Sequence, residues 1–226
     1  MTYTVYNFSG APRGWRVLVG LTIKQLEYDV QYLEGSKGEH KEPEYLAIQP
    51  RSTVPTMVAD EFVLRDSVAC LAWLDQQHSE NPLFGATAAE SATIWNLTME
   101  CNDYLRDAVQ QFLYPVLVEN IPLPNAGSAP WEKLLAASNL LHNECSYLNG
   151  LLQDQPYLCG ARASAAEAVA FPEIRLIERG RDRRADAMNA TGFDQFHQRY
   201  PELSQWLRRV ESLEGMDKTF PIHWSN

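Results

Sequence analysis

The segment from Val54 to Leu74 constrains the fold of this chain more than any other. It begins with Val54-Pro55 directly before a strand-like run, Thr56-Met-Val-Ala59, and a second run, Phe62-Val-Leu64, follows after two residues. That spacing predicts a hairpin. Because proline removes a ladder donor beside a strand, we expect a cis Val54–Pro55 bond, which turns the chain sharply and leaves the backbone of Val54 open to a ligand.

A second feature follows the hairpin, where Asp66-Ser67 precedes an apolar stretch from Val68 to Leu74. The pair predicts a helix N-terminus, whose free N–H groups and partial positive charge can hold a carboxylate. The Ser67 hydroxyl adds a donor, and the Asp66 carboxylate can pair with an ammonium. Carboxylate and ammonium on one carbon make an α-amino acid, so the segment predicts a pocket for a γ-glutamyl peptide. The alternative is that Asp66 and Ser67 only cap the helix and Pro55 only forms a turn.

The rest of the first eighty residues mixes two periodicities. Residues 4–8 and 28–32 are strand-like, the apolar residues of 15–26 have helical spacing, and the polar segment 35–43 predicts a loop. With the hairpin and the following helix, the predicted order is β-α-β, loop, β-β-α.

Beyond a connector at residues 76–87, every periodic stretch is helical. We expect helices over residues 88–120 (kinked at Pro115), 131–152 and 164–179, and a last one from Pro201 to Val210. A capping box, Ser164 with Glu167, opens the third of these. The arginine-rich run at its end, from Arg175 to Arg184, is interrupted by acidic residues, which predicts a helix end that faces water.

Composition excludes several functions. Lys and Arg total 19 and Asp and Glu total 29, a net charge of −10 that disfavours nucleic acid and anionic membranes as partners. No apolar run approaches the ~20 residues of a membrane span, and no secretory signal is visible at the start. The four cysteines form no CxxC pair and suit a reducing compartment, so we expect a cytoplasmic protein. The histidines lack metal-ligand spacing, and we expect no metal.

Segments along nearly the whole chain resemble the cytosolic glutathione transferase superfamily, in that family's order. They are Tyr3-Thr-Val-Tyr6 with Trp15-Arg-Val17, the phi-like loop from Gly38 to Leu46, Gln49-Pro50, Val54-Pro-Thr56, Asp66-Ser-Val-Ala69, Tyr157-Leu-Cys-Gly160 with Ser164-Ala-Ala-Glu167, and Tyr200 to Leu207. The resemblance implies the family's combined α/β and all-α fold. A thioredoxin-like domain would span residues 1–78, a linker 79–87 and an all-α domain 88–226, and the protein would be a homodimer.

The resemblance also implies which residues bind glutathione, the cosubstrate of the family. Val54 would pair its backbone with the cysteinyl part, beside Thr53 and Pro55, while Asp66 and Ser67 would hold the γ-glutamyl end. His40 and Lys41 match the pair that reaches the glycyl carboxylate, although a solvated pair of loop residues is the alternative.

The group that activates the thiol is where this sequence departs from the family. Ala11 stands at the position of the catalytic serine of Ser-type members, so we predict that Ser9 is the donor. Alternatives are a Ser-Gly turn without chemistry, the backbone N–H groups around Arg13 and Gly14, or the charge of Arg13. Tyr104 is a candidate for the acceptor pocket, which has no fixed motif.

The resemblance therefore predicts a detoxifying transferase that joins glutathione thiolate to a small apolar electrophile. One alternative is a non-catalytic protein that binds glutathione or another ligand, consistent with Ala11. Another is a glutathione-dependent cis-trans isomerase, suggested by Trp15-Arg-Val17, although the usual Ser-Ser-Cys triplet before that tryptophan is absent.

Overall fold

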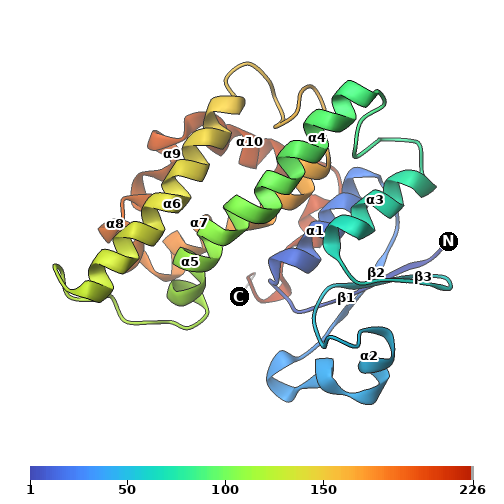
Figure 1. Cartoon of the computed structure of the whole chain (residues 1–226), viewed down its shortest axis with the longest axis horizontal. Helices are drawn as coiled ribbons and strands as arrows, with labels where there is room; N and C mark the ends of the chain where they lie inside the picture. The colour runs from blue at the N-terminus through green and yellow to red at the C-terminus, as the bar shows by residue number, and fades with distance from the viewer. Residues whose placement is uncertain (225–226) are drawn as a thin grey trace.

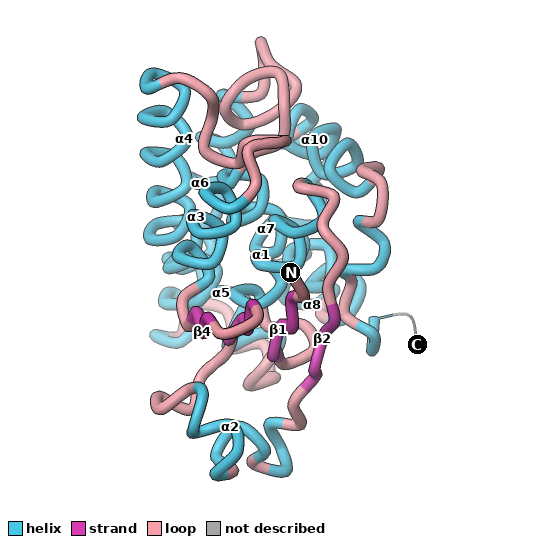
Figure 2. Tube along the Cα trace, turned by 90° about the vertical axis from the view of Figure 1, so that its right-hand side faces the viewer, coloured by secondary structure: helices cyan, strands magenta, loops and turns pink. Residues whose placement is uncertain are grey.

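A four-stranded sheet forms the N-terminal part of the computed structural model, which describes residues 1–224 (Figures 1 and 2). The strands are β1 (Tyr3–Asn7), β2 (Asp29–Tyr32), β3 (Thr56–Ala59) and β4 (Phe62–Leu64), in the order β2-β1-β3-β4. β1 pairs in parallel with β2 and antiparallel with β3, and β4 completes the hairpin. The four predicted strands and the predicted hairpin are confirmed.

Three helices accompany the sheet. α1 (Pro12–Ile23) and α3 (Ser67–Gln77) lie together on the side that faces the remaining helices, and α2 (Pro43–Ile48) lies on the opposite side (Figure 1). The segment predicted as a loop at 35–43 contains two short 3₁₀ turns, Gly35–Lys37 and Glu39–Lys41. Turns this short have no periodicity in the sequence, so pattern analysis does not find them.

The C-terminal part is helical throughout. Its α-helices are α4 (Ala88–Glu100), α5 (Arg106–Leu117), α6 (Ala129–Leu151), α7 (Ala165–Arg183), α8 (Ala185–Ala190), α9 (Phe196–Arg199) and α10 (Pro201–Glu211). The stretch predicted as one helix over 88–120 is helical at every residue from 88 to 117, but it contains a π-helical turn that was not predicted. A π-helical turn at Cys101–Leu105 divides that stretch into α4 and α5, and Pro115 lies in the last turn of α5, where little helix follows for it to disrupt.

Helix α7 is the centre of the helical part, with its first ten residues buried on all sides. The predicted capping box is present, and Glu167 is completely buried. Its carboxylate accepts hydrogen bonds from the Leu158 N–H at 2.6 Å and the Trp206 indole N–H at 3.2 Å. Burial raises the pKa of Glu167, and these donors oppose that rise. The box therefore ties three segments together as well as starting a helix.

A buried ionic cluster joins α1 to α7. Arg16 and Glu173, both fully buried, form an ion pair of 2.7 Å, and Arg106 approaches the second oxygen of Glu173 at 3.1 Å. Arg16 also donates to the side-chain oxygen of Asn102 in the π-helical turn at 2.7 Å. Burial lowers the pKa of Arg16, and Glu173 counteracts that shift. The cluster aligns the start of α1 with the helical part.

The end of the described chain returns to the start of α1 (Figure 1). Two 3₁₀ turns, Met216–Thr219 and Ile222–Trp224, follow α10. Trp15 of α1 packs edge-on against Phe220 and Trp224, with ring centroids 5.3 Å apart in both pairs, and its indole N–H donates to Thr219 at 2.8 Å. No helix among residues 1–224 combines the length and apolar character of a membrane span.

Candidate functional site

A cavity of about 750 Å³ lies where the N-termini of α1 and α3 meet the turn before β3. Its volume is within the range of roughly 300–1,000 Å³ that is typical of ligand pockets. Its lining includes five of the seven predicted glutathione-binding residues, namely Thr53, Val54, Pro55, Asp66 and Ser67. These residues come from two separate segments, and the β3–β4 hairpin brings the segments together.

The turn before β3 exposes backbone groups to this cavity. The Val54–Pro55 bond is cis, as predicted. Tyr45 of α2 supports the turn, since its hydroxyl donates to the Thr53 carbonyl at 2.6 Å and lies 3.0 Å from the hydroxyl of Thr56. No hydrogen bond from residues 1–224 occupies the backbone N–H or C=O of Val54. Both groups can therefore pair with an extended peptide, as in an added strand.

The N-terminus of α3 both caps itself and faces the cavity. One oxygen of Asp66 accepts from the N–H groups of Val68 and Ala69, at 2.9 and 3.1 Å. The second oxygen takes no part in the cap. Ser67 is only 2% exposed, lines the cavity, and makes no side-chain hydrogen bond within the described chain. The capping role and the binding role are thus compatible, because they use different atoms.

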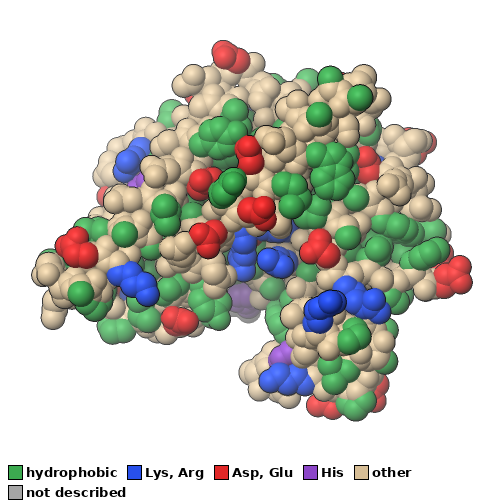
Figure 3. Space-filling view, in the orientation of Figure 1, with side chains coloured by type: hydrophobic (Ala, Val, Ile, Leu, Met, Phe, Trp, Pro, Cys, Tyr) green, Lys and Arg blue, Asp and Glu red, His purple; other side chains and the backbone are tan. Residues whose placement is uncertain are grey.

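Three arginines add positive charge to the cavity, Arg13 from α1, Arg51 from the loop before Thr53, and Arg65 beside Asp66. Within residues 1–224 none of them forms an ion pair with a carboxylate. In Figure 3, positive side chains gather beside the hollow between the helical part and the sheet. The positive charge of these arginines complements the two carboxylates of glutathione. Of the three, only Arg13 was a candidate from the sequence. Arg51 and Arg65 adjoin the two motif segments in the sequence, and that adjacency is the signal by which they could have been found.

His40 and Lys41 lie outside the lining of this cavity. The His40 ring packs edge-on against Phe8 at 5.2 Å between centroids, and its carbonyl accepts from the Ser52 hydroxyl at 2.8 Å. Lys41 is exposed at the end of a 3₁₀ turn. Their contact with a glycyl carboxylate stays a prediction.

A second cavity of about 450 Å³ lies at the turn between β1 and α1. Ser9 and Gly10 line it on one side, the end of α5 and the face of α7 line the others, and His223 and Trp224 close it from the end of the described chain. The Ser9 hydroxyl oxygen lies 2.9 Å from Nδ1 of His223. Partial burial lowers the pKa of His223, and the charges of Arg179 and Arg183 lower it further. Ser9 of the turn lines this cavity, and Arg13, four residues further along in the first turn of α1, lines the first cavity.

The arginine-rich end of α7 is exposed at Asp182 and Arg183, as predicted, but it also lines this second cavity, which was not predicted. Arg184 donates to the carbonyls of Val116 and Ile121, at 2.6 and 2.8 Å, and thereby holds the end of α5. The Arg179 guanidinium lies 5.2 Å from the centre of the Trp224 ring. Contacts between segments this far apart in the sequence leave no local pattern.

The residues at the end of β1 point to opposite sides of the sheet, as alternation predicts. Tyr6 packs against Tyr45 at 5.7 Å between ring centroids, on the α2 side. Asn7 is buried against α1, and a Cβ added to Gly14 would lie 1.9 Å from its side-chain oxygen. Neither Tyr6 nor Asn7 lines either cavity. Of the hydroxyl residues considered at the end of β1 and in the turn after it, Ser9 lines a cavity and Tyr6 does not.

Tyr104, the candidate for the acceptor pocket, lies in the π-helical turn with its side chain exposed, and it lines neither cavity.

The four cysteines are also outside both cavities. Burial raises the pKa of each thiol, that of Cys159 to about 12, which keeps them protonated and unreactive. No group of three potential metal ligands occurs within residues 1–224.

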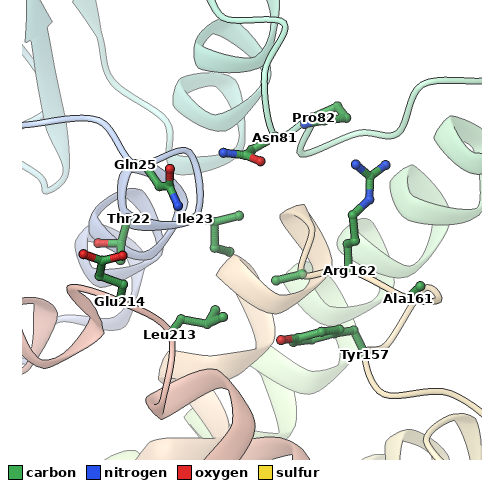
Figure 4. A pocket seen from close by; sticks show the side chains of 11 residues that line it. Thr22, Ile23, Gln25, Asn81, Pro82, Tyr157, Ala161, Arg162, Leu213 and Glu214 are labelled. Carbon is green, nitrogen blue, oxygen red and sulfur yellow. The ribbon is translucent and has the colours of Figure 1, made fainter.

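A third cavity, of about 260 Å³, is separate from these sites (Figure 4). It lies between the end of α1, the connector at Asn81 and Pro82, and the loop before α7, where Tyr157 and Arg162 line it. It contains none of the predicted site residues, so we assign it no part in binding glutathione.

Both the sequence and the fold of this chain are similar to those of known glutathione S-transferases. Residues 11–77 match the family described as the N-terminal domain of glutathione S-transferase. The chain is 29% identical to glutathione S-transferase 1 of Dianthus caryophyllus over 75% of each chain. It is 31% identical to maleylacetoacetate isomerase of Dictyostelium discoideum, over 39% of this chain and 41% of that one. The crystal structure of a glutathione S-transferase from the Antarctic clam Laternula elliptica has the same fold, with a TM-score of 0.80, 24% identity, and coverage of 100% of this chain and 95% of that chain.

Proposed function

Because this chain belongs to the glutathione transferase superfamily, we propose that it is an enzyme that joins glutathione thiolate to a small apolar electrophile. The observation that carries the proposal is a pair of cavities near the start of α1. The first is suited to a tripeptide, and the second has a partly apolar wall beside the Ser9 hydroxyl. We further propose that it acts in the cytoplasm as a detoxifying homodimer. Its thioredoxin-like domain would span residues 1–78, its linker 79–87 and its all-α domain 88–226. Exposed apolar residues of α4, such as Trp95 and Met99, are available for subunit contact.

Glutathione would lie extended along the first cavity. Its cysteinyl part would pair with the backbone of Val54, and its γ-glutamyl ammonium would meet the free oxygen of Asp66. The γ-glutamyl carboxylate would accept from Ser67 at the positive end of α3. Arg13, Arg51 and Arg65 supply the remaining positive charge.

Replacing Ser67 with alanine is expected to weaken glutathione binding about 10- to 100-fold, because a donor to a carboxylate contributes roughly 1.5–3 kcal/mol. Isothermal titration with glutathione measures the effect. Ser79→Ala is the matched control, since Ser79 is exposed just beyond the other end of α3 and should leave affinity unchanged. Normal affinity in Ser67→Ala would contradict the γ-glutamyl assignment.

Thiol activation is assigned to Ser9 with His223. A free thiol has a pKa of about 8.5 and is mostly protonated at neutral pH. In the proposed step the thiol proton moves to the Ser9 oxygen while the Ser9 hydroxyl proton moves to Nδ1 of His223. One S–H and one O–H bond break, and one O–H and one N–H bond form. The thiolate then faces the Ser9 hydroxyl, attacks the electrophile, and displaces its leaving group, after which the imidazolium releases its proton to solvent.

This step predicts an acid limb in the pH profile. Only the neutral imidazole accepts a proton, so activity is present above the pKa of His223 and is lost as pH falls through it. Because that pKa is lowered, the limb is expected on the acid side of the usual value of about 6.5. The charged groups that face His223 are Arg179 and Arg183 of α7, and the β1–α1 turn presents only the Ser9 hydroxyl.

The measurement is kcat/KM for the electrophile against pH at saturating glutathione. In His223→Gln the limb should disappear and the plateau should fall. His197→Gln is the control, because His197 lies outside both cavities and should keep the original profile. An unchanged limb in His223→Gln would remove the imidazole from the step.

A specific observation favours each of two alternatives. Ala11 caps α1 without a side-chain hydrogen bond, which suits a carrier that binds glutathione without turnover. The similarity to maleylacetoacetate isomerase suits an isomerase. Retention on immobilised glutathione followed by an aryl halide assay separates them from a transferase, since both alternatives predict binding with no conjugation.

A further inference from the structure

The second cavity contains two arginines that form no ion pair with a carboxylate within residues 1–224, although Asp182, Glu211 and Asp217 share a neighbouring cavity with Arg179. Arg179 and Arg183 are four residues apart on α7, so they lie on one face of the helix, and both line the cavity. Other arginines of this stretch are paired, Arg175 with Glu211, Arg181 with Glu178 and Arg184 with Asp186, at 2.7–3.0 Å. Within residues 1–224 neither Arg179 nor Arg183 has a carboxylate within ion-pair distance.

This excess of positive charge occurs on a protein with a net charge of −10, so it is not a property of the surface as a whole. Arg179 also lies over the ring of Trp224, which fixes its guanidinium at the cavity wall. Part of the remaining wall is apolar, with Leu117 and Val118 at the end of α5 and Leu176 one turn before Arg179, and Asn120 and Arg184 add polar groups to it. The opposite side holds Ser9, where the proposed function puts the thiolate.

We propose that this cavity selects acceptors that carry an anionic group, such as a carboxylate or sulfonate, on an apolar body. The apolar body would pack between Leu176, Trp224 and the end of α5, while the anion would bind Arg179 and Arg183. Guanidinium groups bind planar carboxylates and sulfonates with paired hydrogen bonds, which makes them selective for such groups. The proposal rests on the proposed function, because it names the substrate class of the same reaction.

The test uses two acceptors that differ only in charge, 4-chloro-3,5-dinitrobenzoate and its primary carboxamide. Each kcat/KM is divided by the rate constant for the same acceptor with glutathione alone, at pH 7.5, which removes the difference in intrinsic reactivity. The acid is expected to be preferred at least about tenfold, the effect of one charge-assisted hydrogen bond. The preference should fall several-fold in Arg179→Gln and in Arg183→Gln, and Arg183→Lys, which keeps the charge, should retain part of it.

Arg208→Gln is the matched control. It makes the same change in net charge on the exposed face of α10, outside the cavity, and should keep the original preference. The measured quantity is the ratio of the normalised kcat/KM for the acid to that for the carboxamide. An effect of the arginines on the thiolate or on His223 changes both values equally, so it cancels in this ratio. If a variant fails to fold, the preference of the unmodified protein for the acid over the carboxamide still tests the proposal.

Binding is measured separately by titrating the unmodified protein with 4-nitrobenzoate and 4-nitrobenzamide, which cannot react. Conjugation of both acceptors with no acid preference, and equal binding of both ligands, would overturn the anionic selectivity and leave the transferase activity standing. Preferential binding of the benzoate with no conjugation would overturn the transferase activity and support the anion site. Equal binding and no conjugation would overturn both.

Discussion

Replacing Glu173 with alanine is expected to lower the free energy of unfolding by about 3–5 kcal/mol, because it leaves the fully buried Arg16 without its counter-charge. The substitution removes the acceptor of two arginines at once, Arg16 at 2.7 Å and Arg106 at 3.1 Å. Arg106 is partly exposed and can turn to solvent, whereas Arg16 cannot. Urea denaturation followed by circular dichroism measures the loss.

Glu211→Ala is the matched control for this prediction. Glu211 also pairs with an arginine, Arg175, at 2.7 Å, but both side chains are partly exposed to solvent. Its loss is expected to cost no more than about 1 kcal/mol. Equal losses for Glu173→Ala and Glu211→Ala would show that burial of the cluster has no energetic weight.

A double variant separates the cost of an orphaned charge from the value of the pair itself. Arg16→Met with Glu173→Met fills the same space without charge, and such replacements are often neutral or stabilising. We therefore expect the double variant to be more stable than Glu173→Ala. If it were less stable, the ionic cluster itself would stabilise the contact between α1 and α7, beyond avoiding an unpaired arginine.

The largest expected effect on activity comes from Ser9→Ala, with a fall in kcat of about 10²–10³-fold, the usual consequence of removing a donor to a developing negative charge. Glutathione affinity should change much less than kcat, because the groups proposed to bind the two ends of the peptide line the first cavity and stay in place. An aryl halide assay at saturating glutathione gives the rate, and titration of glutathione gives the affinity. The exposed Ser36, replaced by alanine, is the control.

Unchanged rates in Ser9→Ala would remove this hydroxyl as the activator. The activator would then be sought among the backbone N–H groups at the start of α1 or in Arg13, which lines the first cavity from that helix. Arg13→Gln would distinguish these two, because it removes the charge and leaves the backbone donors in place.

Features with local causes were predictable from the sequence. The cis bond at Pro55, the cap at Asp66 and the capping box at Ser164 each depend on residues within a few positions of one another. The hairpin of β3 and β4 depends on two short apolar runs and the spacing between them. For the same reason, five predicted binding residues line one cavity, since two local motifs and one hairpin suffice to bring them together.

Features with distant causes were not predictable. His223 meets Ser9 across 214 residues, and Arg16 meets Glu173 across 157. The sequence around each of these residues is the same whether or not the partner is near, so neither periodicity nor spacing reveals the contact. The arginine-rich end of α7 resembles a solvated helix end for this reason, and only the packing of α5 and the chain end around it makes it a cavity wall.

By itself, the sequence determined the four strands, the helices α1 and α3, and the two motifs that shape the first cavity, because hydrogen bonding and sterics between near neighbours decide turns and caps. Only the tertiary structure decided what lies beside Ser9 and which charges the second cavity presents. Those depend on which distant surfaces bury each other, and that burial is a property of the whole folded chain.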